Sequence, residues 1–128
     1  MAKSTRSPLE KFMAESIKMA KRRDADKGFS FDESITIDFL VGLYRGQRGL
    51  CIHTGEEMTL ERGLVGKDEN GKGGIPCFTL CTIDRIDNTR GYSTDNIMMA
   101  CDGINRMRGN MSLKRFRALC KKVGLSAE

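Results

Sequence analysis

The sequence contains a single histidine, His53, and no tryptophan. It has no apolar run long enough to cross a bilayer, so we expect no membrane-spanning segment. No apolar segment follows the polar residues at the start of the chain, so we expect no secretory signal. Its five cysteines are odd in number and irregularly spaced, which argues against a disulfide framework. These absences favour a reduced, cytoplasmic protein.

Charge is unevenly distributed along the 128 residues, although the net charge is only +5. Residues 1–23 carry seven Lys/Arg and two acidic residues. Residues 103–128 carry seven Lys/Arg and one acidic residue. Residues 24–102 carry eight Lys/Arg and fourteen acids. Basic ends around an acidic centre fit binding to a phosphate backbone with a cation site between them. Lysine-rich helix faces also occur for solubility alone, so charge leaves both interpretations open.

Two helices are predicted in the first half of the chain. Ser7, Pro8 and Glu10 form a helix start with a capping box, and this helix should end within residues 24–28. A second helix is predicted over residues 36–47, and its wider apolar face predicts that it is the more buried of the two. Residues 68–74 indicate an exposed loop or a hairpin tip. They lack the Gly-Lys-Ser/Thr ending of a nucleotide-binding loop, which excludes that interpretation.

The second half of the chain predicts two strands followed by two helices. Residues 78–83 favour a strand, residues 88–91 a turn, and residues 97–100 a short second strand. A helix should follow over residues 101–108. Ser112 should cap a last helix that runs to about Val123, with Leu113, Phe116, Leu119 and Cys120 on its apolar face.

An ordered set of residues spans these elements: Ile83-Asp84-Arg85-Ile86-Asp87, Gly91-Tyr92, Asn96 and Ile104-Asn105. Each residue alone suits a turn or a cap, but the ordered set resembles the HNH (ββα-metal) nucleases over about residues 36–120. The resemblance implies an α+β fold with a hairpin–helix core flanked by N- and C-terminal helices. We divide the chain into a basic helical arm, 1–28, and an HNH-like domain, 29–128.

The resemblance assigns roles to four residues, Asp84, Arg85, Asn96 and Asn105. Asp84 falls on the metal-binding acid and Asn105 on the second metal contact, while Asn96 falls on the residue that braces the catalytic loop. Oxygen ligands of this kind suit one Mg²⁺ ion, with Mn²⁺ as the second choice. Arg85 stands where the family has its catalytic histidine.

Arg85 cannot act as the general base, because a guanidinium stays protonated. The sequence therefore leaves open which residue, if any, takes that role. In one interpretation Arg85 stabilises the phosphate while water attacks without a protein base. In a second, Asp87 or His53 is the base; an exposed Asp is a weak base, and a lone His is more often a packing or surface residue. In a third, the protein is an HNH-fold binding module that does not cleave.

Residues 47–55 resemble the lead-in segment of phage and bacterial HNH-like proteins, many of which hold a structural zinc with two Cys-x-x-Cys pairs. Here the pairs read Cys51…Thr54 and Cys101…Ile104, so each keeps one cysteine. Adding His53 still leaves an incomplete tetrahedral set. We expect no structural zinc, with Cys51 and Cys101 as small buried residues.

The function implied is a metal-dependent HNH endonuclease acting on DNA, in a bacterial or phage-infected cell. The alternative is a catalytically degenerate protein, phage-encoded, that binds nucleic acid or a protein. The residues expected on the DNA backbone are Arg106, Arg108, Lys114, Arg115 and Arg117. A second candidate surface is the first helix, with Lys11, Lys18, Lys21, Arg22 and Arg23. That helix is alternatively a packing element or the interface of a homodimer.

Overall fold

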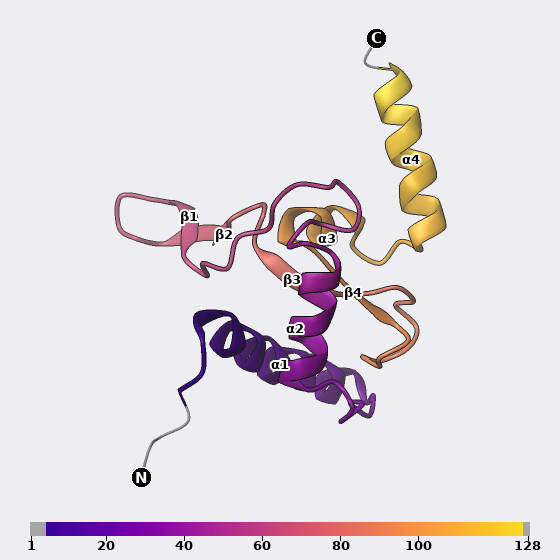
Figure 1. Cartoon of the computed structure of the whole chain (residues 1–128). Helices are drawn as coiled ribbons and strands as arrows, with labels where there is room; N and C mark the ends of the chain where they lie inside the picture. The colour runs from indigo at the N-terminus through magenta and orange to yellow at the C-terminus, as the bar shows by residue number, and fades with distance from the viewer. Residues whose placement is uncertain (1–4, 127–128) are drawn as a thin grey trace.

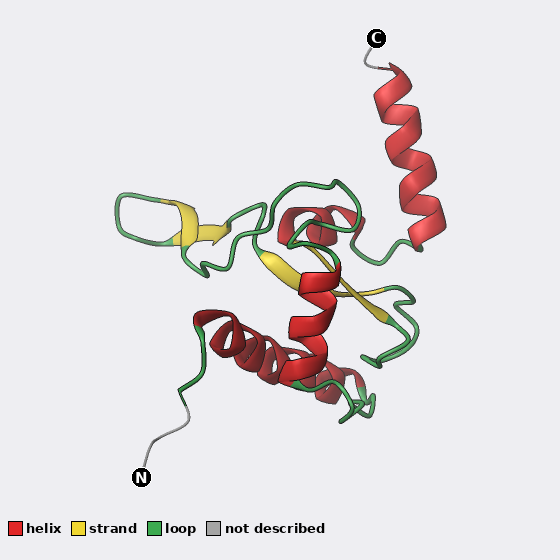
Figure 2. Cartoon of the chain, in the orientation of Figure 1, coloured by secondary structure: helices red, strands yellow, loops and turns green. Residues whose placement is uncertain are grey.

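The computed structural model describes residues 5–126, which form four helices and two small antiparallel sheets (Figures 1 and 2). The fold class is α+β, as the sequence predicts. The elements in chain order are α1 (Pro8–Lys27), α2 (Ile37–Gly46), β1 (Leu64–Lys67), β2 (Gly73–Pro76), β3 (Cys81–Arg85), β4 (Ile97–Cys101), α3 (Asp102–Arg108) and α4 (Leu113–Ser126). No helix within residues 5–126 is both long and apolar enough to cross a membrane.

Helix α1 begins and ends where the sequence predicts. The Ser7 hydroxyl accepts from the Glu10 N–H at 3.2 Å, and the Glu10 carboxylate accepts from the Ser7 N–H at 2.9 Å. Gly28 ends the helix in the left-handed conformation, with φ of 76°. Five residues of α1 are buried, whereas Leu40 is the one buried residue of α2. The prediction that the second helix is the more buried one is therefore wrong.

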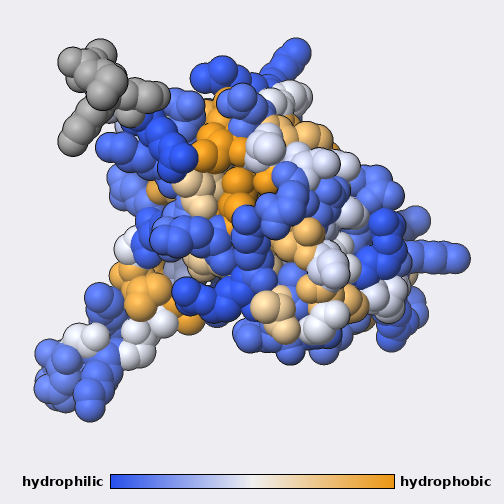
Figure 3. Space-filling model, turned by 90° about the horizontal axis from the view of Figure 1, so that it is seen from below, coloured by the Kyte–Doolittle hydropathy of each residue, from blue (hydrophilic) through white to orange (hydrophobic). Residues whose placement is uncertain are grey.

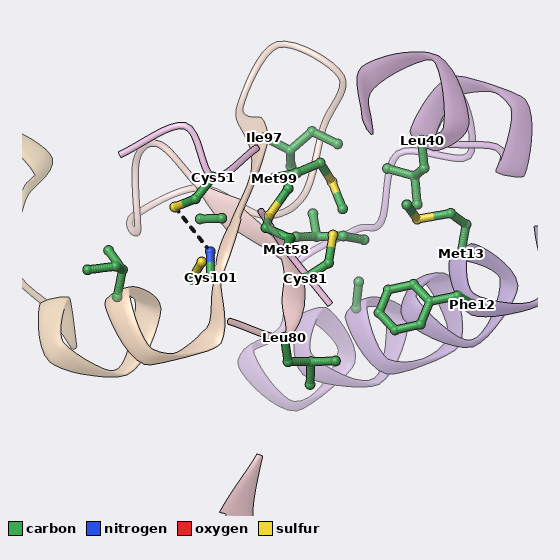
Figure 4. Close-up of a cluster of buried hydrophobic side chains, with 14 of the residues drawn as sticks. Phe12, Met13, Leu40, Cys51, Met58, Leu80, Cys81, Ile97, Met99 and Cys101 are labelled. Atoms are coloured by element: carbon green, nitrogen blue, oxygen red, sulfur yellow. Dashed lines mark hydrogen bonds between the residues drawn. The ribbon is translucent and has the colours of Figure 1, made fainter. Parts of the chain in front are cut away.

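The core lies where the β3–β4 hairpin meets α1 and α2 (Figure 4). All five residues of β4 are buried, because α2 and α3 both pack against this strand. Phe12 and Met13 of α1 reach the same cluster as Leu40 of α2. The apolar stripe of α1 is thus used for packing within the chain, which fixes α1 against the hairpin.

Strand β3 begins at Cys81, three residues later than the sequence predicts. A turn precedes it, in which the Leu80 N–H donates to the Cys77 carbonyl at 2.9 Å. The strand pairs with β4 so that Asp84 lies opposite Met98 and Arg85 opposite Ile97. Helix α3 follows β4 directly, which gives the β–β–α order expected from the motif.

Two elements project from this body. The β1–β2 hairpin extends as an arm, with a hydrophilic tip and apolar residues nearer the body (Figure 3). Leu64, Val65 and Ile75 on this arm are about half exposed. Helix α4 is capped by Ser112, whose hydroxyl accepts from the Arg115 N–H at 3.1 Å. Phe116 is the one buried residue of α4, so most of its apolar face is exposed.

Candidate active site

The end of β3 places Asp84 at the centre of a buried polar cluster. Its side chain is only 2% exposed. One carboxylate oxygen, Oδ1, accepts from Nη1 of Arg108 at 3.1 Å. The other, Oδ2, lies 3.2 Å from Nε2 of His53. Burying a carboxylate is costly unless it is paired and hydrogen-bonded, and these two partners supply both conditions.

Arg108, in the last turn of α3, is an internal residue. Its side chain is 1% exposed and donates to the carbonyls of Arg85 at 2.6 Å, Ile86 at 2.8 Å and Met111 at 3.0 Å. These bonds tie α3 to the chain that leaves β3. The guanidinium has no access to a DNA phosphate in this arrangement. The structure therefore corrects the sequence-based assignment of Arg108 to the DNA-contacting set.

His53 comes to Asp84 from the turn that follows α2. The backbone of this turn is held to the hairpin, because the Ile52 N–H donates to the Met99 carbonyl at 3.2 Å. The imidazole is 7% exposed and lines a second pocket with Ile104, Phe116 and Arg117. In the tautomer that donates Nε2–H to Asp84, the lone pair on Nδ1 has no donor among the described residues and can accept a proton. The chain's single histidine thus contacts the expected metal-binding acid.

Asn96 holds the loop between β3 and β4 in place. Its side-chain oxygen accepts from the Asp87 N–H at 2.8 Å. Its amide nitrogen donates to the carbonyls of Asp87 and Gly91, each at 3.0 Å. The side chain is buried, with 1% of the residue exposed. Asn96 therefore cross-links both ends of residues 87–91, which carry Arg85's backbone partners.

Arg85 is held over the ring of Tyr92. Its Cζ lies 5.3 Å from the ring centroid, and its Nη1 donates to the carbonyls of Asn88 at 3.3 Å and Arg90 at 3.0 Å. Its contacts with described residues use Nη1 and the face of the guanidinium. The Nε and Nη2 protons have no partner among residues 5–126, so they are free to bind an anion.

A pocket of about 180 Å³ brings together three of the four residues that the resemblance singles out. Asp84, Arg85 and Asn105 line it, while Asn96 does not line it and bonds to the loop between β3 and β4 instead. The remaining lining residues are Arg23, Lys27, Ile83, Asn88, Tyr92 and Gly109. Arg23 and Lys27 come from α1, so a helix outside the hairpin contributes two cations to the pocket.

The other predicted DNA contacts lie outside this pocket. Arg106 is exposed, and its Nε donates to Asp102 at 2.5 Å in an i, i+4 pair on α3. Lys114, Arg115 and Arg117 are exposed on α4, so they are accessible to a polyanion. Their role as DNA contacts stays a prediction.

Comparison with solved structures finds a match to the rare-cutting HNH restriction endonuclease PacI, in a structure reported for its mechanism of DNA perturbation. The two sequences are 19% identical, and the match covers 88% of this chain and 77% of PacI with a TM-score of 0.58. The chain resembles PacI in fold. No family model matches the sequence, and a search of curated proteins finds no match.

The likeness to PacI covers a larger share of the chain than residues 36–120, which the motif alone suggested. The matched region therefore includes elements other than the β3–β4 hairpin and α3. At 19% identity the likeness shows the HNH-type fold alone, because one fold can carry different activities.

The donor atoms in the pocket suit a cation held by few protein ligands. Asp84 and Asn105 offer carboxylate and amide oxygens, which are hard ligands. Within residues 5–126, His, Cys, Asp and Glu side chains form no group of three or more able to hold a metal ion. Mg²⁺ keeps several waters and binds through one or two carboxylates with substrate phosphate. A cation at this pocket would have to share the carboxylate of Asp84 with Arg108 and His53.

The two cysteines of the broken zinc pairs lie side by side. Cys51 and Cys101 are 3% and 0% exposed, and the Cys101 N–H donates to Sγ of Cys51 at 3.3 Å (Figure 4). Burial alone would raise the pKa of the Cys51 thiol, but hydrogen bonds led by the Cys101 N–H and the Thr54 hydroxyl lower it overall. Burial raises the pKa of Cys101 to about 12, so this thiol keeps its proton at neutral pH.

Proposed function

We propose that the protein is an HNH-type, metal-dependent endonuclease that hydrolyses DNA phosphodiester bonds. One observation carries the proposal: Asp84, Arg85 and Asn105 line a single pocket, although Asn105 lies on a different element from the other two. The fold likeness to PacI, a restriction endonuclease, supports the choice of reaction and of DNA as the substrate. Asp84 and Asn105 would hold one divalent cation, with Mg²⁺ as our first choice. When bound, it would polarise the phosphodiester and stabilise the leaving oxygen.

Arg85 is proposed to bind the non-bridging oxygens of the phosphate. Its guanidinium faces the pocket and is oriented by Tyr92 and by two backbone carbonyls. A preorganised cation stabilises the charge that develops on these oxygens when water attacks phosphorus. This role needs no proton transfer, which suits a group that stays protonated.

His53 is proposed to be the general base. Of the two candidates raised by the sequence, Asp87 is exposed, and hydrogen bonds from the hydroxyl and backbone N–H of Thr89 lower the pKa of its carboxyl further. A carboxylate of lower pKa is a weaker base. His53 contacts Asp84, which would fix the tautomer with Nδ1 as the acceptor. His53 lines the second pocket and not the one that contains Arg85, so the attacking water would enter from the side of the second pocket. Its proton would pass to His53 as the oxygen bonds to phosphorus and the ester oxygen leaves.

Purified protein is therefore expected to nick supercoiled plasmid DNA in Mg²⁺ or Mn²⁺. Excess EDTA should stop the reaction, and adding back the cation should restore it, because the phosphodiester is polarised by a bound ion. Gel conversion of supercoiled to open-circular plasmid measures this. Cleavage that continues in EDTA would contradict the metal-dependent proposal.

Replacing His53 with alanine should slow nicking by roughly 10²–10⁴-fold, the usual contribution of a positioned general base. Free imidazole in the buffer should restore part of the lost rate, because it can enter the space left by the side chain. Ile52→Ala is the matched control, since Ile52 is in the same turn and is 47% exposed. A His53→Ala rate within about threefold of the unaltered protein would remove His53 from the mechanism.

The second candidate function is an HNH-fold protein that binds nucleic acid or a protein without cleaving. The observation that favours it is the double pairing of Asp84, because Arg108 and His53 occupy both carboxylate oxygens. This function predicts salt-dependent binding with no turnover in any divalent cation. The plasmid assay separates the two candidates.

A further inference from the structure

The C-terminal turn of α1 forms one wall of the pocket that contains Asp84 and Asn105. Arg23 and Lys27 lie one helical turn apart, and both line the pocket with Arg85. These two residues come from outside the β–β–α unit. With Asp84 already paired to Arg108, the exposed charge around the pocket is positive.

Buried contacts fix this turn of α1 against the loop between β3 and β4. Asp24 is 1% exposed, and its Oδ2 accepts from the Tyr92 N–H at 3.0 Å. A Cβ on Gly91 would lie 3.0 Å from the same oxygen and 2.9 Å from the Cβ of Phe29, so only glycine fits there without displacement. The position of Arg23, next to Asp24, is therefore set by the fold.

Tyr92 organises two guanidinium groups at once. Its hydroxyl accepts from Nη1 of Arg23 at 3.4 Å, and its ring lies under Arg85, whose Cζ is 5.3 Å from the centroid. Two like charges gathered at one side chain repel each other unless an anion lies between them. A phosphodiester is the anion that suits paired guanidinium groups, because its oxygens accept several N–H bonds.

We propose that Arg23 is a substrate-binding residue, positioned by the hydroxyl of Tyr92, which with Arg85 holds the phosphodiester of DNA in the pocket. The inference rests on the proposed function for its substrate but assigns a contact that the β–β–α unit does not contain. Tyr92 is the positioning residue. Lys27, one turn further along α1, adds a point charge at the rim of the same pocket.

The test measures DNA binding as a function of salt for Arg23→Met and for Arg22→Met. Both residues are exposed neighbours on α1, but Arg22 does not line the pocket. Arg23→Met should weaken binding roughly tenfold and reduce the slope of log K against log salt by about one, as expected for one lost phosphate contact. Arg22→Met should leave the slope nearly unchanged, because Arg22 belongs to the broader basic face of α1 and does not line the pocket that would hold the phosphate. Thermal melts verify that both variants are folded.

Tyr92→Phe tests the positioning role, because it removes the hydroxyl but keeps the ring under Arg85. It should weaken DNA binding less than Arg23→Met does. In the Arg23→Met background it should have no further effect, since the two changes act on one contact. An additive loss in the double variant would overturn the role of Tyr92.

The outcomes separate this inference from the nuclease proposal. Equal losses and equal slope changes for Arg22→Met and Arg23→Met would show that α1 acts only as a diffuse positive surface, which overturns the inference. Full affinity of Arg23→Met would also overturn it. A selective loss in Arg23→Met, in a protein that never nicks plasmid, would support the phosphate contact while refuting the nuclease. Absence of DNA binding at low salt would overturn both.

Discussion

Replacing Asp84 with asparagine should reduce plasmid nicking by roughly 10³-fold or more. The carboxylate would lose its charge at the position where the proposed cation is held, and charge stabilisation at such a position accounts for several kcal/mol of the barrier. Asparagine keeps the shape and one oxygen acceptor, but it leaves the buried guanidinium of Arg108 without its carboxylate, so a thermal melt must first show that the variant is folded. The loss should appear in kcat, measured at saturating DNA, more than in DNA affinity.

The matched control for this change is Asp87→Asn. Asp87 lies three residues further along the same segment, but it is exposed and does not line the pocket. Its carboxylate accepts from the N–H and hydroxyl of Thr89 at 2.9 and 2.7 Å, a local turn contact. We expect Asp87→Asn to nick at close to the unaltered rate. An Asp84→Asn protein that is folded and equally active would mean that the cation is not held by Asp84.

The sequence predicted the hairpin, the loop and the helix of the site because their signals are local. Asp and Asn side chains of the β3–β4 loop bond to backbone groups within the same loop, as Asp87 does to Thr89 and Asn96 does to Gly91. Helix caps at Ser7 and Thr36 likewise act within three residues. Short-range chemistry of this kind can be read from residue order alone.

The contacts of Asp84 were not predictable in the same way. His53 lies 31 residues before it and Arg108 lies 24 residues after it. Spacing carries no information about pairings of this length, which depend on how α3 and the turn after α2 pack on the hairpin. The one available signal for His53 was its position in the segment that resembles the lead-in of HNH-like proteins.

The burial of two charged side chains, Arg108 and Asp24, also differs from what their residue types suggest. Arginine and aspartate are almost never fully buried unless they are paired, so the sequence places Arg108 among the exposed DNA contacts and predicts no role for Asp24. Both prove to be internal because each has backbone partners: carbonyls for Arg108 and the Tyr92 N–H for Asp24. These partners become adjacent only when the loop between β3 and β4 is closed.

Replacing Arg108 with methionine should lower the free energy of unfolding by about 3–5 kcal/mol, the range found when one partner of a buried ion pair is removed. The change leaves Asp84 with His53 as its remaining partner and leaves the carbonyls of Arg85, Ile86 and Met111 without their donor. Unpaired buried acceptors are costly, because water cannot replace the lost bonds. Small domains of this size have about 5–15 kcal/mol in total, so the loss should be large.

Denaturant unfolding measures this loss as a shift of the midpoint at constant m value. Arg106→Met is the matched control: Arg106 lies on the same helix, but it is half exposed, and its one ion-pair partner among residues 5–126 is Asp102. An exposed pair of that kind contributes about 0–1 kcal/mol, so the control should change stability little. Arg108→Lys should lie between the two, because an ammonium keeps the charge but cannot reach three carbonyls and a carboxylate in the geometry of a guanidinium. Equal midpoints for Arg108→Met and Arg106→Met would mean that the buried pair adds nothing to the stability of the fold, and that β3 and α3 are joined by apolar packing alone.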